Sequence, residues 1–377
     1  MLLRGKSLSG PKDGRCLLCG HPLGGVARVL GICPSCVKNR PEECREHIKR
    51  VHARSREMFG LPASPPAKPE GLECKLCLHR CRPGKNQKGY CGVRHGEKSS
   101  MQRDGRSRAL VSYYRDPLPT NCVADWVCPG GTGAGYPCFS NDRGPEVGFY
   151  NLAVSLEACN LNCLFCQNWS FRKAHLAPRW ATTETLEREI DDSTSCICFF
   201  GGDPGPQLPY AVGLSHEVRK KNRGRILRIC WETNGLLNPA GLKAMMKLAV
   251  KSGGCVKMDL KAWNPAVHRA LCGVENSRIL DNFARAAEWA SQRLTPPALV
   301  ASTPLIPDFI DKEEIYALAS FIARINPGIP YALLACAPQF LMDESPTTSA
   351  AQADACLRAA KEAGLTCVRI GNEHLLS

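Results

Sequence analysis

From about Phe149 onward, short apolar runs alternate with longer amphipathic segments. The runs have the length of strands, and the segments between them have the length of helices. The expected strands are 151–156, 196–200, 226–231, 256–260, 299–306, 331–335 and 367–370. Such a succession of strand and helix units predicts a parallel sheet covered by helices, either open or barrel-like. Functional residues are then expected at the carboxyl ends of the strands.

Three of the intervening helices have recognisable starts. The side chain just before a helix can accept a hydrogen bond from an N–H group of the first turn. Proline at the first helical position, or Glu/Gln three residues after the capping residue, also indicates a helix start. These signals occur at Asn238–Pro239, Asp311–Glu314 and Ser349–Gln352. After Asp311, the apolar residues at 315, 318, 322 and 325 fall on one helical face, which is expected to face the core.

The chain before residue 149 is organised by cysteines, and its first part is residues 1–60. Cys16 and Cys19 form one CxxC pair, and Cys33 and Cys36 form another. Two such pairs at this separation predict a zinc-ribbon-like site, with buried or incidental cysteines as the alternative. A charged stretch, 41–56, is expected to be helical. The proline-rich stretch 61–69 is expected to be a linker.

A second cysteine-rich segment, residues 61–148, leads to the β/α region 149–377. It holds Cys74, Cys77, Cys81 and Cys91, which are candidate ligands of zinc or of an iron–sulfur cluster; His79 is a less favoured alternative ligand. Further along, Cys122, Cys128 and Cys138 lie in a region rich in glycine and proline, and their spacing matches no ligand pattern.

Composition adds a redox argument and a charge argument. The chain has 23 cysteines, an odd number, and no readable export signal or membrane span, so a cytoplasmic protein using cysteine for metal binding or redox chemistry is expected. Residues 1–110 hold 23 Lys/Arg against 9 Asp/Glu. A basic surplus is most often a solvated face; RNA binding is the minority interpretation, because this part has only Phe59 and Tyr90 as aromatic residues.

The most informative motif directly follows the first expected strand of the β/α region. Cys159, Cys163 and Cys166 form a CxxxCxxC motif, with Phe165 immediately before the last cysteine. Three thiolates can hold three irons of a 4Fe-4S cube and leave the fourth iron open, as in catalytic metal sites. A zinc loop or a chance grouping is the alternative.

This motif resembles the signature of the radical S-adenosylmethionine (radical SAM) superfamily. The resemblance implies a partial (β/α)6-type TIM barrel, and SAM bound to the open iron. In that family the reduced cluster cleaves SAM to methionine and a 5′-deoxyadenosyl radical, which abstracts hydrogen from a substrate. The resemblance also implies an anaerobic oxidoreductase and a reducing partner of the flavodoxin or ferredoxin type.

Further motifs follow at successive strand ends, in the order that the resemblance implies. Gly201, Gly202 and Asp203 are similar to the family's Gly-Gly-Glu motif, with Asp in place of Glu. The segments 232–235 and 259–261 look like parts of glycyl-radical-enzyme activases. Candidate SAM-pocket residues are therefore Phe165, Gly201, Gly202, Asp203, Asn234, Asp259 and Lys261.

Residues 72–377 also resemble the radical SAM member of the AmmeMemoRadiSam group, which is similar to pyruvate formate-lyase activating enzymes. The likeness rests on the motifs CxLCxHxC, GYCGVR, CQNW and DLKAW and on Leu271–Gly273. The segment from Cys16 to Cys36 has no counterpart in the activase pattern. The remaining cysteines in apolar runs or helices are expected to be core packing: Cys196, Cys198, Cys230, Cys255, Cys336, Cys356 and Cys367.

The leading functional hypothesis is therefore an activating-enzyme-like radical SAM enzyme with a 4Fe-4S cluster, SAM and zinc. Its substrate is open and could be a protein. Two alternatives stay open: modification of RNA or another protein through the basic front region, and a non-catalytic metal or redox protein. No catalytic acid or base is expected beyond the cluster, because abstraction of a hydrogen atom needs none.

Overall fold

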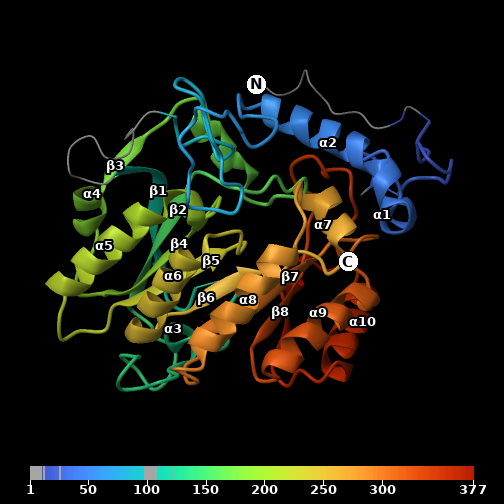
Figure 1. Ribbon diagram of the computed structural model, residues 1–377. Coiled ribbons are helices and arrows are strands. Elements are labelled where there is room, and N and C mark those ends of the chain that lie inside the picture. The colour runs from blue at the N-terminus through green and yellow to red at the C-terminus, as the bar shows by residue number, and fades with distance from the viewer. Residues whose placement is uncertain (1–10, 12, 25–26, 97–107, 121) are drawn as a thin grey trace.

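The computed structural model describes residues 11, 13–24, 27–96, 108–120 and 122–377 (Figure 1). A single nine-stranded sheet, in the order β3-β1-β2-β4-β5-β6-β7-β8-β9, forms its centre. The strands are β1 (Arg108–Pro117), β2 (Tyr150–Leu156), β3 (Trp180–Thr182), β4 (Thr194–Gly201), β5 (Arg228–Thr233), β6 (Val256–Asp259), β7 (Leu299–Leu305), β8 (Tyr331–Ala335) and β9 (Val368–Gly371).

The seven strands from β2 onward, β3 excepted, pair in parallel and confirm the predicted β/α series. Within the described residues, the outer strands β3 and β9 have no pairing with each other, so the sheet is open. This is the mixed α/β architecture with a large parallel sheet that the sequence predicts.

Two strands were not expected from the sequence. β1 pairs antiparallel with both β2 and β3. Much of β1 is exposed or half-buried and carries charged residues, so it lacks the apolar signal of the parallel strands. Because β1 belongs to the same sheet as β2, the sheet begins before residue 149.

The third parallel strand, β5, lies two residues later than the expected 226–231. Its pairing with β4 starts at Arg228, opposite Cys196, and the strand continues through Glu232. The apolar run ends at Trp231, and the expected strand ended with it. Polar side chains continue this strand because they point into a cavity rather than into an apolar core.

The helices are α1 (Pro34–Asn39), α2 (Pro41–Glu57), α3 (Pro129–Thr132), α4 (Thr183–Glu187), α5 (Leu208–Lys221), α6 (Pro239–Ser252), α7 (Pro265–Cys272), α8 (Ser277–Ala290), α9 (Lys312–Ile325) and α10 (Ala350–Glu362). Short 3-10 helices occupy Trp169–His175, Gly205–Gln207 and Glu373–Leu375.

The predicted caps are confirmed. Asn238 accepts from the Ala240 N–H, Asp311 from the Glu314 N–H, and Ser349 from the Gln352 N–H. On α9, Ile315, Leu318 and Ile322 are buried, and only Ile325 in the last turn is half-buried. These caps fix where the helices begin and therefore which faces they bury.

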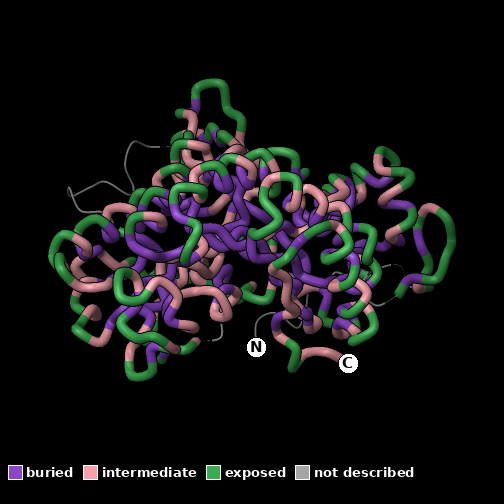
Figure 2. The backbone as a smooth tube through the Cα atoms, turned by 90° about the horizontal axis from the view of Figure 1, so that it is seen from below, coloured by how far each residue is buried: buried purple, intermediate pink, exposed green. Residues whose placement is uncertain are grey.

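Helices α5, α6, α8, α9 and α10 lie along one side of the sheet, which leaves the other side of the strands as an interior (Figure 1). The buried chain runs through the middle of the molecule and the exposed chain surrounds it (Figure 2). Among the described residues, no helix has both the length and the apolar composition needed to cross a membrane.

The N-terminal helices α1 and α2 pack beside α7 (Figure 1). The predicted helix 41–56 is confirmed by α2. The predicted linker 61–69 contains neither helix nor strand, apart from a single bridge between Ala67 and Arg82. The N-terminal segment therefore touches the β/α region directly, next to the carboxyl ends of the strands.

Candidate functional site

The loop after β2 carries the predicted triad of Cys159, Cys163 and Cys166, and we call it the cluster loop. Its backbone is tied to the end of α7, where the Asn162 N–H donates to the Cys272 carbonyl at 3.0 Å. Cys163 is buried, and the other two cysteines are half-buried. The triad thus lies on a fixed loop whose sulfurs are largely shielded from water.

The N-terminal segment holds this loop from a second side. The Asn162 amide donates to His52 Nδ1 at 2.9 Å and to the Ser55 hydroxyl at 2.6 Å, and its oxygen accepts from Arg172 at 2.7 Å. His52 Nε2 lies 3.0 Å from the Ala270 carbonyl. These partners require a neutral ring with its proton on Nε2. Burial lowers the pKa of His52 to about 4, in agreement with that state.

The second cysteine-rich segment supplies a third contact to the loop. His79 Nε2 lies 2.6 Å from the Asn160 carbonyl, and the Asn160 side chain donates to the Leu236 carbonyl and accepts from the Asn234 amide, both at 2.8 Å. Burial lowers the pKa of His79, so the neutral ring donates to the carbonyl. His79 therefore braces the cluster loop through this nitrogen.

One cavity brings the triad and all the predicted SAM-pocket residues together. It encloses about 930 Å³ between protein atoms, part of it open to solvent. The predicted residues that line it are Cys159, Cys163, Phe165, Cys166, Gly201, Gly202, Asp203, Asn234, Asp259 and Lys261. Residues more than a hundred positions apart thus meet at the carboxyl ends of adjacent parallel strands, as this architecture predicts.

The glycine pair after β4 allows the chain to pass close to the cluster loop. Gly201 has φ +100°, and a Cβ there would lie 2.2 Å from the Ser155 hydroxyl. A Cβ on Gly202 would lie 2.3 Å from the Ala158 carbonyl oxygen, which belongs to the backbone of the cluster loop. Both positions therefore require glycine.

The carboxylate of Asp203 links the ends of β4 and β5. It accepts from the Asn234 N–H at 2.7 Å, the Thr233 hydroxyl at 3.0 Å and the Gly205 N–H at 2.7 Å. Burial raises the pKa of Asp203 to about 6, against the lowering effect of the Asn234 and Gly205 N–H groups. Asp203 thus positions Asn234, whose amide nitrogen lies 3.7 Å from Cys159 Sγ.

A buried lysine faces the opposite side of the cavity. Lys261 Nζ contacts Asp259 at 2.5 Å and lies 5.8 Å from the centre of the Phe165 ring. Burial acts to lower the pKa of Lys261, but the negative charges of Asp259 and of a Cys163 thiolate outweigh burial and raise it. Ser302 also donates to Asp259. The cavity therefore presents a permanent cation next to the cysteines.

The first predicted metal site is geometrically complete. Cys16, Cys19, Cys33 and Cys36 place their sulfurs within 4.8 Å of one another, the only such ligand group among the residues that the structure describes. Backbone N–H groups point at the sulfurs, as from Cys33 to Cys16 at 3.4 Å. For Cys16, burial alone would raise the pKa, but these N–H donors lower it to about 6. Four convergent cysteines can bind a metal ion.

The second set of four cysteines gathers more loosely. Within the part of the chain that the structure describes, Cys74, Cys77, Cys81 and Cys91 do not form a group at single-ion spacing. Burial raises the pKa of Cys77 to about 12, and the other three thiols add to that shift. The four are therefore close neighbours without the compact arrangement that a single zinc ion requires.

Sequence reasoning missed part of the cavity lining. Glu232, Thr233 and Cys336 line the same cavity. The first two are the last residues of β5 and belong to the motif that identified Asn234, so their place in that motif was a usable signal. Cys336 was expected to be core packing; it is buried, but it lies at a cavity wall at the end of β8.

Comparison with protein families identifies the region that holds this cavity. Residues 154–322 match the radical SAM superfamily. This segment is a radical SAM domain. It includes the cluster triad and every strand end that lines the cavity except that of β8. The radical SAM resemblance drawn from the cysteine spacing is thereby confirmed.

Two curated relatives are activating enzymes. The isethionate sulfite-lyase activating enzyme of Desulfovibrio desulfuricans is 33% identical over 134 residues, covering 36% of this chain and 39% of the relative. The enzyme of the same name from Nitratidesulfovibrio vulgaris is 30% identical over 140 residues, with the same coverage. The chain thus spans about two fifths of the length of these relatives.

Solved structures show more distant likeness. A domain of a pyruvate-formate lyase-activating enzyme from Bacteroides vulgatus is 24% identical, covers 46% of this chain and 98% of its own, and has a TM-score of 0.36. SuiB from Streptococcus suis, bound to its precursor peptide SuiA, is 17% identical, covers 54% of this chain and 42% of its own, and has a TM-score of 0.40.

Proposed function

We propose that this protein is a radical SAM enzyme that reductively cleaves S-adenosylmethionine to generate a 5′-deoxyadenosyl radical. The observation that carries the proposal is the cavity in which three cysteines of the radical SAM domain meet the glycine pair and the buried lysine. A 4Fe-4S cluster with SAM on its open iron would supply the radical chemistry.

The donor set fits such a cluster. Cys159 Sγ accepts from the Leu161 N–H at 3.4 Å and faces the Asn234 amide at 3.7 Å. Burial raises the pKa of the three thiols, and the hydrogen bond to Cys159 and the cation on Lys261 act in the opposite direction, toward the thiolate form that iron binds. In this proposal Cys159, Cys163 and Cys166 hold the cluster.

The remaining lining residues would position SAM. Gly201 and Gly202 leave backbone groups accessible beside the cluster loop. Asn234, held in place by Asp203, and the Asp259–Lys261 pair present hydrogen-bond donors, an anion and a cation. This polarity suits the amino and carboxylate groups of SAM, and Phe165 gives the cavity an apolar wall.

The decisive experiment is a cleavage assay. The full chain is reconstituted with iron and sulfide without oxygen, reduced with dithionite and mixed with SAM. The proposal expects 5′-deoxyadenosine and methionine to accumulate beyond a control without protein. A loaded cluster that forms neither product would support the non-catalytic metal or redox protein instead.

The activating-enzyme relatives suggest a protein as the substrate and a flavodoxin- or ferredoxin-type protein as the natural reductant. We also propose zinc at Cys16, Cys19, Cys33 and Cys36, because the four sulfurs converge at single-ion distance. For Cys74, Cys77, Cys81 and Cys91, the looser spacing favours an iron–sulfur cluster over a single ion.

Replacing Gly202 with alanine is expected to lower 5′-deoxyadenosine formation at least about tenfold. The new Cβ would lie 2.3 Å from the Ala158 carbonyl and push the cluster loop aside, and misplacement by about 1 Å can cost on the order of a hundredfold in rate. The cleavage assay at equal iron content measures the effect.

The matched control is Gly213→Ala in α5. A Cβ there meets no atom within 4 Å apart from its chain neighbours and the backbone of its own helix, so alanine is expected to stabilise the helix slightly and leave cleavage unchanged. Equal activity of the Gly202→Ala protein and the wild type would contradict the assigned role of this close approach.

A further inference from the structure

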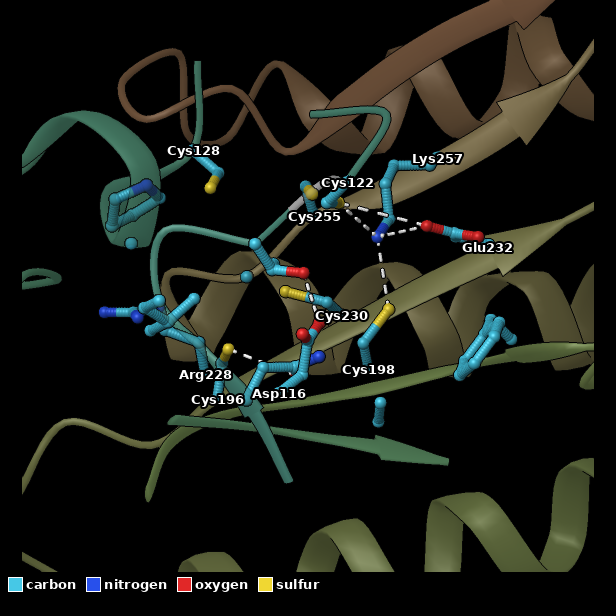
Figure 3. Close-up of a pocket in the computed structure, with 18 of the residues that line it drawn as sticks. Asp116, Cys122, Cys128, Cys196, Cys198, Arg228, Cys230, Glu232, Cys255 and Lys257 are labelled. Carbon is cyan, nitrogen blue, oxygen red and sulfur yellow. Dashed lines mark hydrogen bonds and ion pairs between the residues drawn. The ribbon is translucent and has the colours of Figure 1, made fainter. Parts of the chain in front are cut away.

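A second cavity lies on the inner side of the sheet, toward the amino-terminal halves of the strands. It encloses about 760 Å³, part of it open to solvent. Six cysteines line it: Cys122, Cys128, Cys196, Cys198, Cys230 and Cys255 (Figure 3). The last four were expected to be core packing. They are instead thiols at the wall of a cavity, and the two-residue spacing of Cys196 and Cys198 on β4 puts both on its inner face.

Strand register places three of these thiols side by side. Cys198 on β4 is the register partner of Cys230 on β5. Trp231 is the partner of Val256, so the preceding residue Cys255 lies beside Cys230. The strands β4 and β5 and the residue directly before β6 therefore present one cysteine each at the same level. The segment that follows β1 brings Cys122 to the same place (Figure 3).

A buried cation faces these thiols. Lys257 Nζ lies 3.0 Å from Cys122 Sγ, 3.1 Å from Cys198 Sγ and 2.8 Å from Glu232 (Figure 3). Only 2% of the Lys257 side chain is exposed. A buried ammonium requires negative charge close by. Glu232 supplies one such charge, and thiolates or an anionic group bound by them would add to it.

The other two cysteines of the cavity have partners of their own. Cys196 donates to the Asn151 side chain at 3.3 Å, and Cys128 donates to the Asp125 carbonyl at 3.8 Å. Cys122, Cys198, Cys230 and Cys255 are thus the thiols gathered in the row and around Lys257.

The spacing of these sulfurs decides what they can hold. In the described chain they do not form a ligand group within 4.8 Å, so a single tetrahedral ion would not be shared by them as they stand. The cavity has room for a larger group. We propose that Cys122, Cys198, Cys230 and Cys255 bind a further iron–sulfur cluster, separate from the one at the triad and from the one proposed at Cys74, Cys77, Cys81 and Cys91, with Lys257 balancing its negative charge.

The position of this site relates it to the first cavity. Glu232 lines both cavities, and Val123, next to Cys122, lines the first. The proposed cluster would therefore lie behind the cavity of the triad, within the same sheet interior. The cluster is detected by iron content and spectra rather than by product, so a failure of SAM cleavage would leave this proposal separately testable.

The test compares the full-length Cys198→Ala/Cys230→Ala variant with the wild type after anaerobic reconstitution with iron and sulfide. Loss of a cluster is expected to lower the iron content by about two to four ions per chain, the content of a 2Fe-2S or 4Fe-4S cluster. The Mössbauer and electron paramagnetic resonance signals of the triad cluster should persist. Cys356→Ala, which removes a buried thiol of α10 outside both cavities, is the matched control.

Iron content equal to that of the Cys356→Ala control would overturn the proposal, and so would zinc replacing iron in the wild-type site. Should the double variant be insoluble, the single variants Cys198→Ala in β4 and Cys255→Ala directly before β6 are measured instead. Each is expected to lose the same cluster signal. An unchanged signal in either one would also overturn it.

Discussion

Cys163→Ala is expected to reduce 5′-deoxyadenosine formation to background. Cys163 is the most deeply buried cysteine of the triad, and its loop is fixed by hydrogen bonds to α7 and α2. The loss should exceed the roughly 10- to 100-fold reduction that follows removal of an outer hydrogen-bond partner of a metal ligand. The assay compares product per chain under reducing, oxygen-free conditions.

A second variant, Cys33→Ser, tests whether the loss of activity in Cys163→Ala is specific to the cluster site. Cys163→Ala should keep the zinc proposed at the N-terminal site, whereas Cys33→Ser should lose about one zinc ion per chain, as expected for a four-cysteine site. Elemental analysis measures both metals. Full cleavage activity in the Cys163→Ala protein would show that another set of cysteines holds the cluster.

The largest expected effect on stability comes from a buried ion pair below the sheet interior. Glu146 and Arg228 are 0% and 2% exposed, and their side chains meet at 2.5 Å. The Ser195 hydroxyl and the Asn141 N–H also donate to Glu146, both at 2.7 Å. Replacing Glu146 with leucine leaves the Arg228 guanidinium buried without its counter-charge. We expect a loss of about 3–5 kcal/mol in the free energy of unfolding, measured with denaturant.

An exposed ion pair provides the control. Glu43 pairs with Arg40 at the start of α2, and both side chains are largely exposed. Glu43→Ala should leave the unfolding transition unchanged within error, because solvent screens such a pair. A similar small effect of Glu146→Leu would mean that water reaches Arg228 or that another group neutralises it.

The Glu146 carboxylate also predicts that the free energy of unfolding depends on pH. Burial acts to raise the pKa of Glu146, but the Arg228 guanidinium outweighs it and lowers the pKa from 4.5 to about 2. Since the folded-state pKa lies below the unfolded value, the stabilisation is present above pH 4.5 and is lost as the pH falls toward 2. Unfolding measured across this range should show the loss in the wild type and a smaller one in Glu146→Leu. Parallel curves would contradict this assignment.

The sequence predicted the parallel strands and the cluster cavity because both leave local signals. Apolar runs marked the strands, and the triad, the glycine pair and Asn234 each followed a strand directly. β1 escaped prediction because an antiparallel, partly exposed strand has a weak apolar pattern. The contact between His52 and Asn162 spans 110 positions and has no local pattern at all.

The thiol-lined cavity was also not predicted from the sequence. Cysteine in an apolar run looks the same whether it packs against neighbours or faces an open space. Only the register of Cys198, Cys230 and Cys255 across neighbouring strands separates the two cases. Lys257 was the one hint in the sequence, since a lysine inside a buried strand needs a partner.

The hydrogen bonds between α2 and the cluster loop have a practical consequence for where this protein can be truncated. The sequence predicts that the segment from Cys16 to Cys36 lies outside the activase pattern, so a truncation of the N-terminal segment could be considered. Yet His52 and Ser55 form the rear wall behind Asn162 and the buried Arg172. In a shortened protein starting after α2, that wall would be open to water, so the proposed cluster at the triad would lose its shelter even with every one of its ligands present.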